Sequence, residues 1–139
     1  GGIVNVIIVL RGSAMRLVLR LLLGVIGLAA LMLTARLWLD PAMAGAKLGV
    51  SATGPLGLAT LRADLAGFFG VVGGLTLAAA IRADARLLTA PMLLIGAALA
   101  GRVITVLVQG LQPEMVGPMV VEAVLVVILA FGRRSLVAA

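Results

Sequence analysis

The chain has 139 residues, of which 63% are hydrophobic and only 12% charged, and its mean hydropathy is +1.31. A typical soluble domain is about half apolar and a quarter charged, and a chain this small buries only ~60–70% of its surface on folding. The composition therefore excludes a soluble globular domain and predicts an all-α integral membrane protein. The net charge of +6 comes from basic residues at the ends of apolar runs, without aromatic residues between them, which argues against nucleic-acid binding.

The residue types that most enzymes use are missing. The sequence contains no Cys and no His, so it has no thiolate nucleophile, no sulfur ligand for a metal and no imidazole base. The serines, Ser13, Ser51 and Ser135, all lie outside the predicted membrane segments. We therefore expect no enzymatic activity, no metal and no cofactor.

Four apolar runs predict a bundle of four membrane-spanning helices, at about residues 17–39, 58–81, 87–108 and 115–131. Residues 1–14 hold an apolar run of only eight residues, which is too short to span, and Met15 follows them. We interpret residues 1–14 as an upstream or engineered extension, and residues 15–139 as a single four-helix domain.

The first predicted helix ends at Asp40-Pro41, because proline disfavours helix at the residue before it. Trp38 at this end is typical of the interface between lipid chains and headgroups. Gly24, Gly27 and Ala30 keep small residues near one face of this helix. The following stretch, residues 40–57, is rich in Gly, Ala and Pro and is predicted to be a loop with at most a short interfacial turn.

The basic residues near the helix ends predict the orientation. Seven arginines belong to one side of the membrane and two basic residues to the other, and by the positive-inside rule both termini are then cytoplasmic. The seven are Arg11, Arg16, Arg20, Arg82, Arg86, Arg133 and Arg134, and the two are Arg36 and Lys47.

Charged residues also occur inside the predicted helices. Asp64, Arg102 and Glu122 lie six or seven residues from the outer ends of their helices, which places them roughly 9–11 Å below the outer surface, with Arg62 slightly shallower. A charge at such a position is unfavourable unless it is paired. We therefore expect a layer of ion pairs in which Arg102 is the hub, held by Glu122 and Asp64. Arg36, paired with Asp40 one turn later, would cover this layer.

Glycines in the second and third helices suggest close helix packing. Asp64, Gly67 and Gly74 fall on one face, and Gly70 and Gly74 form a small-xxx-small pair, which lets a neighbouring backbone approach closely. We expect packing roles for these glycines, for Gly73 and for Gly101. Asp64 should then face protein.

The charge cluster of Arg62, Asp64, Arg102 and Glu122 allows more than one role. It can act as a structural clamp that fixes which helices pack together, or it can form a binding or transport site, because embedded ionisable groups often mark solute or proton paths. Catalysis by Asp64 and Glu122 as acid and base would lack an activated nucleophile.

Three segments, LRADLAGFFGVVGGL, AGRVITVLVQG and VVEAVLVVILAFGRR, resemble a family of small bacterial membrane proteins known as domain of unknown function 4345. The resemblance covers about residues 15–134. It implies four helices, with Arg62 in the second, Gly101 and Arg102 in the third and Glu122 in the fourth. The family carries no established activity. A more distant likeness to DoxX-type four-helix proteins concerns the fold alone.

Two functions follow as expectations. The first is an accessory or scaffold subunit in the bacterial inner membrane, which packs in the bilayer against a membrane-protein partner or as a homo-oligomer. The second is a binder or carrier of a small amphipathic or anionic molecule or lipid from the outer leaflet, with Arg62 or Arg102 as its anchor.

Overall fold

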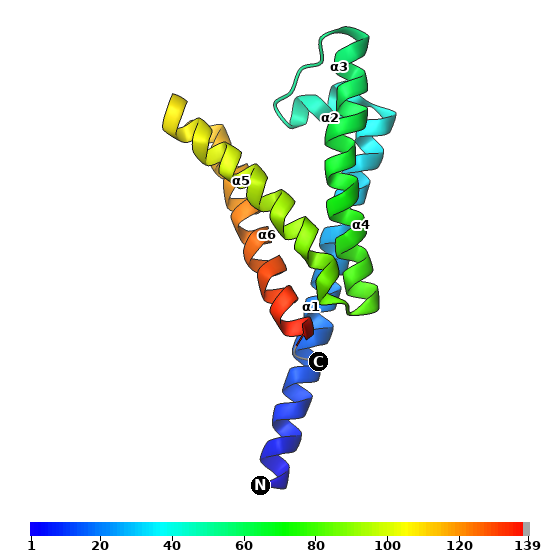
Figure 1. The fold of residues 1–139 in the computed structure, drawn as a ribbon, viewed down its shortest axis with the longest axis vertical. Coiled ribbons are helices and arrows are strands. Elements are labelled where there is room, and N and C mark those ends of the chain that lie inside the picture. Colours follow the sequence, from blue (N-terminus) through cyan, green and yellow to red (C-terminus); the bar gives the residue numbers. More distant parts are fainter. Residues whose placement is uncertain (138–139) are drawn as a thin grey trace.

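The computed structural model describes residues 1–137, and this part of the chain is all-helical (Figure 1). Four helical segments are long and apolar enough to cross a membrane: Gly2–Leu39, Gly54–Arg82, Ala85–Gln109 and Pro113–Leu136. This arrangement indicates a multi-pass membrane protein. Within residues 1–137, one short helix at Pro41–Lys47 lies outside these four segments.

The first helix, α1 (Gly2–Leu39), begins far earlier than the predicted start near residue 17. The prediction applied the length needed to span a membrane, but a helix needs no such minimum, and no proline interrupts the chain before Pro41. With 38 residues, α1 is roughly 57 Å long. Its residues 2–18 are exposed, and its N-terminal part projects beyond the rest of the molecule (Figure 1).

After α1 the chain turns through a short helix, α2 (Pro41–Lys47), in the stretch predicted as a loop. The Asp40 side chain caps its N-terminus by accepting a hydrogen bond from Met43 N. Leu37, Ala44 and Ala66 form a small apolar cluster that holds α2 against α1 and the next long helix.

The second spanning segment is one continuous helix in three parts. It comprises α3 (Gly54–Thr60), a π-helical turn η1 (Leu61–Leu65) and α4 (Ala66–Arg82). It begins four residues earlier than predicted, because Pro55 occupies the first turn, where a missing N–H does no harm. The helix ends where Ala83 adopts a left-handed conformation at φ 52°.

The last two spans form a hairpin. A 3₁₀ turn, η2 (Ala85–Leu88), leads into α5 (Thr89–Gln109), which ends at Gly110 with φ 82°. Helix α6 (Pro113–Val137) then begins with proline in its first position.

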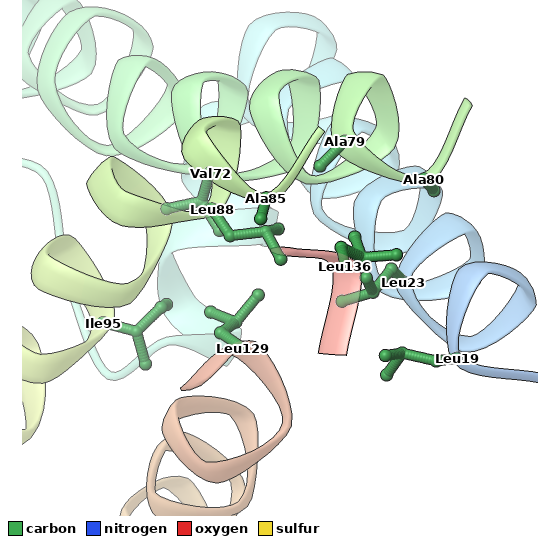
Figure 2. Packing of buried hydrophobic residues seen from close by; sticks show 10 residues of the cluster. All are labelled: Leu19, Leu23, Val72, Ala79, Ala80, Ala85, Leu88, Ile95, Leu129 and Leu136. Atoms are coloured by element: carbon green, nitrogen blue, oxygen red, sulfur yellow. The ribbon is translucent and has the colours of Figure 1, made fainter. Parts of the chain in front are cut away.

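The four long helices are arranged as two pairs, α1 with α4 and α5 with α6, which meet at one end and diverge toward the other (Figure 1). The main core lies where the pairs meet and receives side chains from every long helix and from η2 (Figure 2). It consists of Leu19, Leu23, Val72, Ala79, Ala80, Ala85, Leu88, Ile95, Leu129 and Leu136. Since Arg20, Arg82, Arg86, Arg133 and Arg134 cluster around this end, we call it the arginine-rich end, and the opposite one the α2 end.

Candidate functional site

The charged residues predicted to form one cluster are divided between the two helix pairs. Arg102 on α5 donates from Nε to Glu122 Oε1 on α6 at 2.7 Å, so this ion pair joins the two helices of the hairpin. The Arg102 side chain is 39% exposed and that of Glu122 is 13% exposed. The second carboxylate oxygen, Glu122 Oε2, is buried and has no hydrogen-bond partner within the described residues.

Asp64 does not take part in this pair, contrary to the predicted hub around Arg102. It lies in η1, which packs against α1, α2, α3 and α4, while α5 and α6 diverge from that pair toward the α2 end (Figure 1). Its side chain is exposed and forms no hydrogen bond or ion pair with any residue of 1–137, although it was predicted to face protein. The spacing along each helix predicted similar depths, but it carried no information on the angle between helices.

Arg62 joins η1 to the end of α1 through a reciprocal pair of hydrogen bonds. Arg62 Nε donates to the Trp38 carbonyl at 3.0 Å, and Trp38 Nε1 donates to the Arg62 carbonyl at 3.1 Å. The π turn explains why that carbonyl accepts a side chain. In a regular α-helix the N–H of Ala66 would donate to the carbonyl of Arg62. Here it donates to the carbonyls of Leu61 and Ala63 instead, so the Arg62 carbonyl is left without this backbone donor.

A second contact lies one helical turn away, further along the contact between α1 and α4. Buried Thr34, four residues before Trp38, donates from Oγ1 to the carbonyl of Ala66, four residues after Arg62, at 3.0 Å. The sequence shows Thr34 and Trp38 at helical spacing, but the π turn that provides their acceptors has no sequence signature we could use.

The closest approach of two helices occurs between Gly27 of α1 and Gly73 of α4. A Cβ on Gly73 would lie 2.8 Å from the Gly27 carbonyl oxygen, and a Cβ on Gly27 would lie 2.9 Å from that of Gly73. Backbone meets backbone here, so only glycine fits at both positions without a shift of the helices.

Gly73 was among the glycines predicted to pack, but the other four, Gly67, Gly70, Gly74 and Gly101, make no such close backbone contact within the described residues. A Cβ on Gly67, Gly74 or Gly101 would meet no atom of the described chain within 4 Å, and on Gly70 it would make ordinary contact with Thr34 at 3.5 Å. The small-xxx-small pattern placed the close approach on the second helix correctly, but the contact face lies one residue away, at Gly73.

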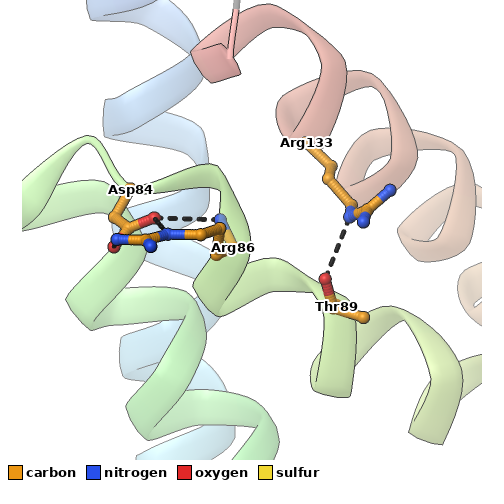
Figure 3. A network of polar contacts seen from close by, with 4 residues as sticks. All are labelled: Asp84, Arg86, Thr89 and Arg133. Atoms are coloured by element: carbon orange, nitrogen blue, oxygen red, sulfur yellow. Dashed lines mark hydrogen bonds and ion pairs between the residues drawn. The ribbon is translucent and has the colours of Figure 1, made fainter.

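Arginines organise the opposite, arginine-rich end. Arg20 of α1 donates from Nε to the Ala80 carbonyl at 2.7 Å and from Nη2 to the Ile81 carbonyl at 2.9 Å, which satisfies two terminal carbonyls of α4. Arg133 of α6 donates to Thr89 Oγ1 at the start of α5 at 2.9 Å (Figure 3). Each of these contacts joins the two helices of one pair, α1 to α4 or α6 to α5, at the end where the pairs meet.

Asp84 and Arg86 form an ion pair beside this junction, with Nε–Oδ1 at 3.2 Å (Figure 3). Hydrogen bonds from the Arg86 side chain and from its backbone N–H hold the pKa of Asp84 below its usual value. Within residues 1–137, no group of three or more acidic side chains is placed to hold a metal ion.

Comparisons with protein families, with curated proteins and with solved structures found no match to this chain. The resemblance to the domain of unknown function 4345 family therefore stays a prediction from the sequence segments.

Proposed function

We propose that this protein is an accessory or scaffold subunit of a bacterial cytoplasmic membrane, in which the α5–α6 hairpin packs against a partner helix. Both termini would lie on the cytoplasmic side, since the arginine-rich end carries most of the basic residues. The partner is a second copy of this chain or a different membrane protein, and the experiment below distinguishes them.

The incomplete ion pair between Arg102 and Glu122 carries this proposal. Arg102 lies 16 residues after Arg86, about 24 Å along the helix, and Glu122 lies 11 residues before Arg133, about 16 Å. Both positions fall within a hydrocarbon core of ~30 Å. Only one N–H of the guanidinium bonds to Glu122, and the Arg102 side chain is 39% exposed, so a neighbouring helix can reach its other N–H groups. Glu122 Oε2 also has no donor in the described chain, but it is buried. Such groups need a partner in lipid, and a helix that carries polar side chains would supply it.

Arg62 and Asp64 do not compete for this role, because they belong near the edge of the membrane. Asp64 lies 18 residues before Arg82, about 27 Å along the helix, which approaches the full thickness of the core. The bond from Trp38 to the Arg62 carbonyl puts the indole at the same level, and indole favours the interface. An exposed carboxylate at that level is hydrated and needs no protein partner.

The alternative function, a binder anchored by Arg62 or Arg102, has weaker support. Arg62 is hydrogen-bonded to the Trp38 backbone and Arg102 to Glu122, so each guanidinium already serves a structural contact. An anionic ligand at Arg102 would also lie beside the Glu122 carboxylate.

Photo-crosslinking in native membranes tests the proposal. A photoreactive phenylalanine analogue replaces Thr105, three residues after Arg102 on α5, and in a control chain it replaces exposed Val25 of α1. We expect a protein adduct of one defined mass from position 105 and none from position 25. An adduct of twice the chain mass identifies a homo-oligomer, and any other mass identifies a different partner.

A second variant makes this test specific for the ion pair. Replacing both Arg102 and Glu122 by leucine removes the polar pair and keeps an apolar surface. We expect the adduct from position 105 to disappear while the thermal unfolding of the purified chain remains cooperative. An adduct that persists in the double variant, or protein adducts of equal yield from positions 25 and 105, would contradict the proposal.

A further inference from the structure

At the α2 end, a cleft of ≈ 360 Å³ opens between the last turns of α1 and the short helix α2. Arg36 and Lys47 line it from the two helices, and both side chains are exposed. Within residues 1–137, neither forms a hydrogen bond or an ion pair, so the expected pair between Arg36 and Asp40 is absent. Asp40 also lines the cleft, but its carboxylate caps α2 at Met43 N.

The cleft therefore offers two basic groups against one carboxylate, which is already used locally. Such a site favours an anion, and arginine matches the oxygens of a phosphate better than lysine because its guanidinium presents several donors in one plane.

The rest of the cleft is apolar, and its surface continues along α1 toward the middle of the molecule. Leu33 and Met43 belong to the lining of the cleft. A second hollow of ≈ 230 Å³ shares Leu33 and Arg36 with it and adds Ala29 and Met32. The positions 29, 32, 33 and 36 lie on one face of the helix, so the two hollows form one track about 10 Å long.

We propose that this track binds an anionic phospholipid of the leaflet at the α2 end. The phosphate lies between Arg36 and Lys47, and an acyl chain follows the track past Leu33 to Ala29. The site combines a basic group at the level of the headgroups with an apolar hollow directed toward the membrane interior, and a free phosphate ion would use only the first. The inference is independent of the proposed function, because it involves neither α5 nor α6.

Lipid binding to the purified full-length chain tests the proposal. The protein is reconstituted in phosphatidylcholine nanodiscs that contain a small fraction of phosphatidylglycerol, and the lipids retained after extraction into detergent are counted by native mass spectrometry. We expect phosphatidylglycerol to be enriched over phosphatidylcholine. The variant R36Q/K47Q should lower its affinity about 30-fold, which corresponds to ~2 kcal/mol for two basic residues at a membrane surface.

Two controls separate this site from general attraction. The variant R11Q/R134Q loses the same charge at exposed positions of the other end and should retain phosphatidylglycerol as the unchanged protein does. The variant Ala29→Trp keeps both cations but fills the apolar track, and it should weaken binding of phosphatidylglycerol. Equal losses in both charge variants, or no effect of Ala29→Trp, would overturn the proposal.

Inorganic phosphate serves as the competitor that distinguishes a lipid from a free anion. We expect millimolar phosphate to leave the retained phosphatidylglycerol unchanged, because the acyl chain contributes to its binding. Complete displacement by phosphate would show that the site takes the anion alone and would also overturn the proposal.

Discussion

Two buried threonines, Thr34 on α1 and Thr76 on α4, differ in their hydrogen bonding. Thr34 donates its hydroxyl to the Ala66 carbonyl, whereas Thr76 is fully buried and its Oγ1 has no partner in the described chain. A buried hydroxyl stabilises the fold only when it is hydrogen-bonded, and an unpaired one is unfavourable.

The same isosteric change should therefore have different effects at these two positions. Thr34→Val removes a hydrogen bond and should lower the free energy of unfolding by about 1 kcal/mol. Thr76→Val removes an unpaired hydroxyl and should leave this free energy unchanged or raise it. Unfolding by a denaturing detergent in mixed micelles measures both. Equal losses for the two variants would show that the Thr34 hydrogen bond contributes nothing.

Glycine at position 73 is required by the backbone of α1. Gly73→Ala places a Cβ 2.8 Å from the Gly27 carbonyl oxygen, so the helices must move apart, and we expect a loss of about 1–3 kcal/mol. Gly67→Ala is the matched control on the same continuous helix, since its Cβ meets nothing within 4 Å of the described chain. The thermal midpoint in detergent should fall for Gly73→Ala and stay the same or rise for Gly67→Ala. A fall for both would place a contact at Gly67 that the single chain does not contain.

At the scale of the helices, the hairpin of α5 and α6 depends on one ion pair across its middle. A second polar contact, from Arg133 to Thr89, lies at the arginine-rich end, and apolar residues such as Leu94 and Leu125 are partly buried on these two helices. In lipid, apolar side chains gain little from leaving their surroundings, so the polar pair fixes how the two helices face each other.

Charge exchange tests this pairing directly. Arg102→Glu alone leaves two carboxylates together and should destabilise the chain by about 3 kcal/mol or more. Adding Glu122→Arg restores opposite charges and should recover a large part of that loss. Adding Asp64→Arg instead should recover nothing, because Asp64 lies on the other helix pair. The free energies of the single and double variants form a cycle, and a zero coupling between Arg102 and Glu122 would contradict the pairing.

At the scale of the whole molecule, the stability is concentrated where the two helix pairs meet. Residues 1–12 lie outside this region and are exposed. Deleting residues 1–12 should therefore change the thermal midpoint of the purified protein by no more than the error of the measurement. A clear fall would show that this segment packs against the rest of the chain or against a second copy.

The apolar pattern of the sequence was sufficient to predict the fold class and the number of long helices, because every span must satisfy its backbone internally and show a long apolar run. It gave the ends at Leu39, Arg82 and Gln109 to within one residue, because turn residues follow each of them. The end of the last helix was wrong, since α6 continues through Arg133 and Arg134 to Val137 instead of ending near residue 131. The start of α1 was wrong, since an apolar pattern cannot distinguish a span from a helix that continues past it.

The candidate site was predicted less well, and the reason is geometric. Arg102 and Glu122 lie on consecutive helices joined by a short turn, so their depths alone bring them within reach of each other. The position of Asp64 and the choice of Gly73 over Gly74 depend instead on how α4 is rotated and inclined. The rotation and inclination of α4 depend on all its contacts with α1 and α2 together, so they cannot be predicted from any single residue.

The π turn at Leu61–Leu65 holds one residue more than regular α-helical winding would place over the same length. Removing a single residue there would restore ordinary winding and rotate everything that precedes it by about 100° against α4. The two hydrogen bonds between Arg62 and Trp38 would then be lost. The part of the helix before Ala66 would no longer match the end of α1 and α2.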